Sequence, residues 1–140
     1  MEDKYFIDTN ILVWANDRTE KAKHERAKQI LVDGIARGNV TISTQVLGEF
    51  YVTITRKIQV KLEPSIARKE IHLLKAIEIV EIDLNLVLQA IDISSKYDFS
   101  YWDSLILAAA QKAECTILYS EDLNPNQIVD SITIVNPFAG

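Results

Sequence analysis

The sequence has little cysteine, proline or glycine and no long hydrophobic run: its 140 residues include one Cys, three Pro and four Gly. Because Cys115 has no second cysteine to pair with, an internal disulfide is excluded and a reducing cytoplasm is the expected compartment. The longest apolar runs, such as LILAAA at 105–110, are too short to span a bilayer. The opening residues MEDKYF lack the zones of a signal peptide.

The composition that is present predicts one globular domain over residues 1–140, since 48% of the residues are hydrophobic and 25% are charged. The net charge of −5 is unevenly distributed. Residues 18–75 hold 12 of the 15 Lys and Arg against 6 acids, whereas residues 76–140 hold 2 against 10. This asymmetry is compatible with a basic flank beside an acidic pocket, and equally with charges that only solvate helix faces.

Short apolar segments alternate with segments of helical periodicity along the chain. Strands are predicted at 4–7, 40–43, 77–82, 116–119 and 132–135. Helices are predicted over 19–35, from 44, from 64, from 83 with Asp83 as the N-cap, and over 102–113, the last almost entirely apolar. Such alternation predicts an α/β fold with a mainly parallel central sheet of about five strands and helices on both faces.

Two acidic residues directly follow predicted strands. In KYFIDTNILVWA, Asp8 comes after the first strand and before Thr9 and Asn10; Asp122 comes shortly after the strand TILY. A turn or a helix cap would explain either residue alone. If the two strands are parallel neighbours, however, both carboxylates lie at the carboxyl edge of the sheet, where α/β proteins bind their ligands.

Two further acids lie beside buried stripes of predicted helices. Glu49 is flanked by Gly48 and Phe50, and Asp103 lies in the first turn of the most apolar helix. Each has a structural alternative, which stays open at this point: Asp103 could form a capping box with Ser100, and Glu49 could pair with a nearby base.

Grouped carboxylates are costly to ionise together unless a cation compensates their charge. Mg²⁺ and Mn²⁺ prefer such oxygen ligands, and a bound metal of this kind suits phosphodiester hydrolysis. We therefore predict a metal site formed by Asp8, Glu49, Asp103 and Asp122. Thr9, Asn10 and Ser120 would support it as hydrogen-bond donors.

The motifs that carry these acids resemble those of PIN-domain ribonucleases, specifically the VapC-type toxins of toxin–antitoxin pairs. The matching segments are FIDTNILVWA, STQVLGEFYV, YDFSYWDSLILAAAQKAECTILYSEDL and IVNPF, which follow the family's order and span nearly the whole chain. One departure is visible, because Asn126 stands where relatives with the same SEDL segment often carry glycine. Since Asn tolerates left-handed turns, this change is expected to affect the loop rim rather than the metal site.

The resemblance implies a PIN fold and an acidic quartet of Asp8, Glu49, Asp103 and Asp122, with Asn10 and Ser120 at the family's supporting polar positions. It also implies endonuclease action on RNA with Mg²⁺ or Mn²⁺, a homodimer, and inhibition by a cognate antitoxin protein. No membrane partner is implied.

Candidates for phosphate contacts are basic residues between 18 and 75, namely Lys21, Lys28, Arg56, Lys57, Lys61 and Arg68. Trp102 and Tyr51 could stack on bases, although packing in the core or in a dimer interface is the more common role.

Other functions fit the sequence less well. A phosphatase of the haloacid-dehalogenase type needs Asp-x-Asp after the first strand, where this chain has Asp8-Thr9-Asn10, and a receiver domain needs a late lysine that LYSEDL lacks. The more serious alternative is a non-catalytic PIN module that binds RNA or protein. A purely structural dimerisation domain would need no such acids.

Overall fold

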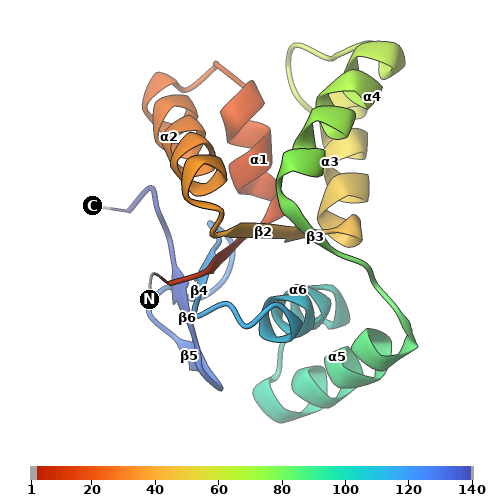
Figure 1. Ribbon diagram of the computed structural model, residues 1–140, viewed down its shortest axis with the longest axis vertical. Coiled ribbons are helices and arrows are strands. Elements are labelled where there is room, and N and C mark those ends of the chain that lie inside the picture. Colours follow the sequence, from red (N-terminus) through yellow and green to blue (C-terminus); the bar gives the residue numbers. More distant parts are fainter. Residues whose placement is uncertain (1–2, 140) are drawn as a thin grey trace.

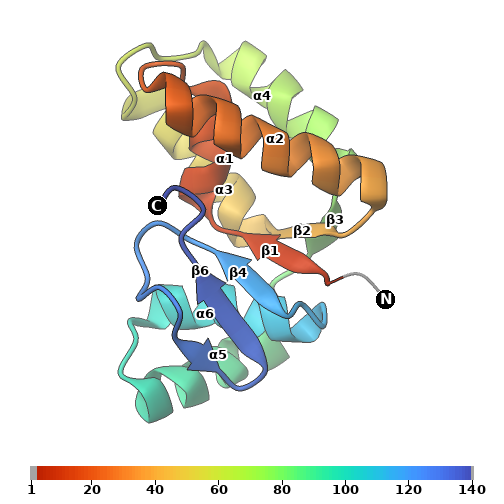
Figure 2. The ribbon, with the colours of Figure 1, turned by 90° about the vertical axis from the view of Figure 1, so that its left-hand side faces the viewer.

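The computed structural model describes residues 3–139 and contains a six-stranded sheet in the order β3-β2-β1-β4-β6-β5 (Figures 1 and 2). The strands are β1 (Tyr5–Ile7), β2 (Val40–Ser43), β3 (Glu78–Val80), β4 (Ile117–Tyr119), β5 (Ile128–Val129) and β6 (Ile132–Val135). All neighbours pair in parallel except β5, which is antiparallel to β6.

The sheet has one strand more than the sequence predicts. The additional strand, β5, has two residues and is joined to β6 by a turn in which Asp130 has φ of +54°. Two residues are too few to display the alternation by which a strand is recognised, so this edge strand was missed.

Helices cover both faces of the sheet, as predicted (Figures 1 and 2). Helices α1 to α4 lie on one face, and α5 and α6 lie on the other. Their bounds are α1 (Thr9–Asn16), α2 (Lys21–Arg37), α3 (Thr44–Arg56), α4 (Pro64–Leu73), α5 (Leu84–Tyr97) and α6 (Tyr101–Lys112), with a 3-10 turn, η1 (Leu74–Ala76), after α4. Within residues 3–139 no helix combines the length and apolar character needed to cross a membrane.

Side-chain caps set the starts of four helices. Ser43, Asp83 and Ser100 accept hydrogen bonds from Val46 N, Leu86 N and Asp103 N respectively, so the predicted cap at Asp83 is confirmed. Asp8 caps α1, a helix that the sequence did not predict, and Thr9 and Asn10 form the first turn of this helix. By satisfying free N–H groups, each cap fixes where its helix leaves the sheet edge.

Helix α6 is buried continuously from Ser104 to Ala110, as its apolar sequence predicts, and it packs against α5. A helix that is apolar all round is stable only when it is covered on every side. Its first turn, which carries Asp103, is thereby held on a rigid element.

The sheet order changes direction at β1. From β1 the chain proceeds outward to β2 and β3, then returns to place β4 on the other side of β1. Such a switch point opens a crevice at the carboxyl ends of the two strands. Ile7 pairs with Tyr119 in the β1–β4 register, so the next residues, Asp8 and Ser120, lie side by side at that crevice.

Gly34 marks a close approach of α2 to the sheet. A Cβ at Gly34 would lie 2.6 Å from Val40 Cβ and 2.4 Å from the Tyr5 hydroxyl, which is itself bonded to Ile30 O. Gly48, on an exposed part of α3, has open space where its Cβ would lie.

These two glycines predict opposite effects on stability. Gly34→Ala is expected to lower the free energy of unfolding by about 1–3 kcal/mol through overpacking. Gly48→Ala is expected to raise it by about 1 kcal/mol, because alanine favours a helix interior. Urea unfolding of both variants measures the difference. Equal effects in the two variants would contradict the close packing at Gly34.

Candidate active site

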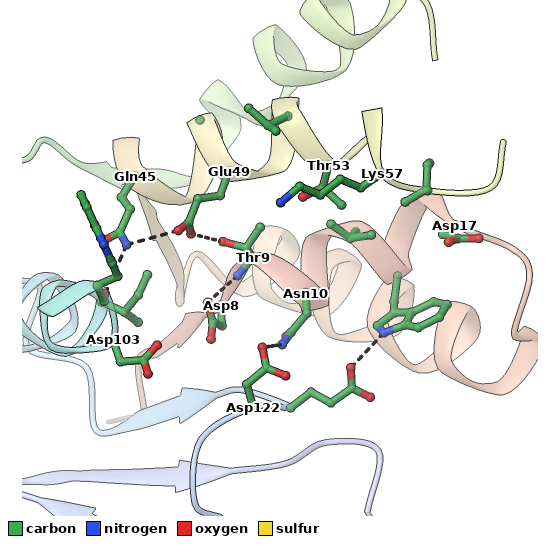
Figure 3. Close-up of a pocket in the computed structure, with 18 of the residues that line it drawn as sticks. Asp8, Thr9, Asn10, Asp17, Gln45, Glu49, Thr53, Lys57, Asp103 and Asp122 are labelled. Carbon is green, nitrogen blue, oxygen red and sulfur yellow. Dashed lines mark hydrogen bonds between the residues drawn. The ribbon is translucent and has the colours of Figure 1, made fainter. Parts of the chain in front are cut away.

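A cavity of about 840 Å³ opens at the carboxyl edge of the sheet, and all four predicted acids line it: Asp8, Glu49, Asp103 and Asp122. Figure 3 shows that they come from different elements: Asp8 follows β1, Glu49 lies on α3, Asp103 on α6, and Asp122 follows β4. Since α3 and α6 cover opposite faces of the sheet, the cavity lies where the two helical layers meet. Thr9 and Asn10 also line the cavity, while Ser120 is fully buried beside it.

Asp8 is the most buried of the four acids, with 9% of its surface exposed. Its carboxylate accepts hydrogen bonds from Thr9 N at 2.7 Å and from Ser120 Oγ at 2.8 Å. Burial raises the pKa of Asp8 from 3.8 to about 6; the two hydrogen bonds oppose the rise, and the charges of Glu49 and Asp122 add to it. Asp8 is therefore an acid whose ionisation at neutral pH is costly without a compensating cation.

The predicted supporting residues each hold one acid. Ser120 bonds Asp8, Thr9 Oγ1 donates to Glu49 Oε1 at 2.7 Å, and Asn10 Nδ2 donates to Asp122 Oδ2 at 3.0 Å (Figure 3). Ser120 Oγ also accepts from the backbone N–H of Asp122 at 3.3 Å, so the hydroxyl that bonds Asp8 at the end of β1 also contacts the segment after β4 that carries Asp122. The bonds of Glu49 thus run to polar neighbours rather than to a base.

Asp103 is held through the backbone. Ser100 Oγ accepts from Asp103 N at 3.1 Å, which is half of the capping box considered from the sequence. The carboxylate remains available to the cavity because it lies on the wall formed by the first turn of α6 (Figure 3). Capping and a role in the site are therefore compatible for this residue.

The structure distinguishes Asp122 from the adjacent acid, Glu121. Glu121 accepts a hydrogen bond from Trp14 Nε1 at 3.2 Å and forms an ion pair with Lys23, whose amine lies 5.0 Å from the Trp14 ring centroid and 5.5 Å from that of Phe138. Both carboxylate oxygens of Glu121 thereby bind neighbouring side chains. Both acids line the cavity, and the Asp122 carboxylate bonds the amide of Asn10.

Sequence reasoning missed Gln45 and did not place Lys57. Gln45 Nε2 donates to Trp102 O at 3.2 Å and reaches Glu49 Oε2 at 3.5 Å. Lys57 is the only Lys or Arg of residues 3–139 that lines this cavity, and Figure 3 shows it with Thr53 on the α3 side. Gln45 lies one turn before Glu49 on α3, a spacing that could have indicated it.

The cavity offers donor atoms of the type that binds a divalent cation. The acids supply hard oxygen ligands, and two buried amide oxygens beside them, Asn10 Oδ1 and Gln45 Oε1, have no hydrogen-bond partner among the described residues. As the side chains stand in residues 3–139, no three Asp, Glu, His or Cys side chains converge closely enough to enclose an ion. In this arrangement Glu49 bonds Thr9 and Asp122 bonds Asn10.

The family model that describes the PIN domain matches residues 5–129. The chain belongs to the PIN domain family. PIN domains generally use divalent metal ions, in keeping with the oxygen donors of this cavity. A search of curated protein sequences found no significant match.

Solved structures with the same fold include a toxin from Mycobacterium tuberculosis, VapC20, described as cleaving the sarcin-ricin loop. Its sequence identity to this chain is 22%, and the TM-score is 0.69 over 85% of this chain and 90% of that chain. A toxin–antitoxin complex from Klebsiella pneumoniae has 21% identity and a TM-score of 0.69 over 96% and 98%. DNA-bound VapBC from Salmonella typhimurium has 14% identity and a TM-score of 0.67 over 95% and 97%. These similarities confirm the PIN-like α/β fold expected from the sequence.

The departure at Asn126 is accommodated as expected. Asn126 has φ of +69°, in the left-handed region that glycine and asparagine tolerate, and its N–H donates to Ile134 O at 2.7 Å. Asn126 is outside the set of residues that line the cavity.

Proposed function

We propose that this PIN domain is a divalent-metal-dependent endoribonuclease that acts as the toxin of a toxin–antitoxin pair. The observation that carries the proposal is the buried carboxylate of Asp8, surrounded by the charges of Glu49 and Asp122 in an acid-lined cavity. A protein that only binds RNA gains nothing from a buried acid with a raised pKa, because it repels phosphate. A metal-dependent nuclease uses grouped carboxylates of this kind as oxygen ligands for its cation.

Asp8, Glu49, Asp103 and Asp122 would hold Mg²⁺ or Mn²⁺ in this site. Such a metal supplies an activated water and neutralises charge that develops on the phosphate. Within the chain, Ser120 orients the Asp8 carboxylate, Thr9 orients Glu49, and Asn10 orients Asp122. These bonds set the direction of the acceptor oxygens before substrate arrives.

Lys57 is our candidate for a phosphate contact. Because it is exposed and lines the cavity, it could neutralise a phosphate of the bound strand. Lys57→Met is expected to weaken RNA binding for every sequence tested, and to reduce the slope of log K against log salt by about 0.7.

The matched control is Lys61→Met. Lys61 is also exposed and four residues away, but it does not line the cavity. Salt titrations monitored by fluorescence anisotropy compare the two variants. An unchanged slope for Lys57→Met, or an equal change for both variants, would contradict the assignment.

An antitoxin protein and a second copy of the chain are the proposed partners. The fold is shared with the chains of toxin–antitoxin complexes from Klebsiella pneumoniae and Salmonella typhimurium, which supports the first. The second is tested by light scattering, which is expected to give about twice the chain mass of 15.9 kDa. A monomer at micromolar concentration would remove the homodimer from the proposal.

Cleavage of labelled RNA by the purified protein tests the function. We expect cutting with Mg²⁺ or Mn²⁺ and none with EDTA. If the protein binds metal by calorimetry but cuts no RNA, the alternative of a non-catalytic PIN module that binds RNA or protein replaces the nuclease.

A further inference from the structure

Trp102 lies exposed at the rim of the acidic cavity. It is the second residue of α6, 62% of its surface is exposed, and it lines the cavity beside Asp103. Core packing, one of the two common roles considered from the sequence, is therefore wrong for this residue. A large exposed aromatic ring next to a group of carboxylates calls for a different explanation.

The ring is held firmly relative to the acids. It contacts the Tyr101 ring edge to face, with centroids 4.9 Å apart and planes at 79°. The main-chain carbonyl of Trp102 accepts a hydrogen bond from the side chain of Gln45, which also reaches Glu49. The following turns of α6 are buried, so Trp102 projects from a rigid base. A fixed aromatic face binds a planar partner with little loss of conformational entropy.

The cavity that Trp102 lines combines polar side chains, among them Gln45, Glu49 and Asp103, with apolar ones such as Val52 and Ile106. A protein partner with an apolar surface would instead match α5, where Leu84, Leu88 and Ile91 are exposed at helical spacing. An unpaired nucleobase has an apolar face and polar edges, so it suits an exposed ring in a cavity of such mixed lining.

Resting on the proposed nuclease function, we propose that Trp102 is a stacking platform for an unpaired base of the RNA, adjacent to the phosphate at the carboxylates. A base within a duplex is covered on both faces by its neighbours, so the platform selects single-stranded or looped RNA. Because any base has a π-face, Trp102 contributes affinity for an unpaired base more than for one sequence. The acids act on the phosphate, and Trp102 binds the neighbouring base.

The test compares two probes that carry the same number of phosphates: a fluorescein-labelled oligouridylate and an abasic ribose-phosphate oligomer. Binding is followed by anisotropy with Ca²⁺ in place of Mg²⁺. Wild-type protein is expected to bind the oligouridylate more tightly than the abasic oligomer, by a factor on the order of 5 to 150. Trp102→Leu is expected to bind both probes equally, and Trp102→Phe to keep part of the preference.

Leu88→Ala, an exposed apolar change on α5, is the control and should keep the full preference. A Trp102→Leu protein that still prefers the oligouridylate, or a wild type without preference or without binding to either probe, overturns the inference. If Trp102→Leu abolishes binding of both probes equally, the residue supports the fold or a protein contact instead, and the inference also fails. Cleavage assays report separately on the nuclease: a base preference lost in Trp102→Leu without any RNA cleavage would overturn the nuclease and leave the stacking site intact.

Discussion

Asp8→Asn is expected to abolish RNA cleavage while making the metal-free protein more stable. The substitution removes a carboxylate that we assign to the metal site, so we expect the rate to fall by roughly 100-fold or more. At neutral pH it also removes a buried charge, and the charges of Glu49 and Asp122 add to the rise in the pKa of Asp8 that burial causes. A residue that served only to cap α1 would leave the stability nearly unchanged on this substitution, because Asn caps a helix about as well as Asp.

The pH dependence of the wild type follows from the same residue. Its pKa is about 6 in the folded protein against 3.8 as the ordinary value, so the folded state binds the proton more tightly than the unfolded state. Stability of the metal-free protein therefore falls as the pH rises from about 4 to about 6, and it stays lower above that range. This difference in the pKa of Asp8 lowers the free energy of unfolding by about 3 kcal/mol at pH 7, relative to a pH below both pKa values. Asp8→Asn should remove this part of the pH dependence of stability.

Thermal unfolding in EDTA at pH 4.5 and pH 7 measures the effect, and addition of Mn²⁺ measures metal binding. We expect Mn²⁺ to stabilise the wild type and to have little effect on Asp8→Asn. Ser120→Ala is the second variant to measure, because it removes the hydroxyl that bonds Asp8 but keeps the Asp8 carboxylate. Equal stabilisation of wild type and Asp8→Asn by Mn²⁺ would exclude Asp8 as a ligand.

The adjacent acids Glu121 and Asp122 are expected to respond oppositely to neutralisation. Asp122→Asn should reduce metal-dependent cleavage by roughly 100-fold or more, with a small effect on stability, since Asp122 is exposed and, within residues 3–139, its carboxylate bonds the side chain of Asn10 alone. Glu121→Gln should retain metal binding. It should lower the free energy of unfolding by about 1 kcal/mol, because it weakens the contacts with Lys23 and Trp14.

Isothermal titration with Mn²⁺ and urea unfolding distinguish the two variants. Lys23→Met provides the matched control, because it breaks the same ion pair from the other side and should reproduce the stability loss of Glu121→Gln. Loss of metal binding in Glu121→Gln with normal binding in Asp122→Asn would reverse the assignment of the two acids.

Much of the fold was predictable because its signals are local. The polar triplet after the apolar segment ending at Ile7, the cap at Asp83 and the apolar run of α6 each depend on neighbours within a few residues. The two-residue strand β5 was not predictable, since so short a segment has no periodicity of its own and gains its pairing from β6.

The residue types of the site could likewise be predicted from the sequence, whereas the hydrogen-bond and ion-pair partners of these residues could not. The sequence by itself determined that acids follow two strands and lie beside two apolar helical stripes. Only the tertiary structure decided that β1 and β4 are neighbours, that Asn10 bonds Asp122 across 112 positions of the chain, and that Lys23 binds Glu121 rather than Asp122. It also decided that Trp102 is exposed. Local propensity and capping depend on nearby residues, but strand order and burial depend on how the whole chain packs, and the site is formed by that packing.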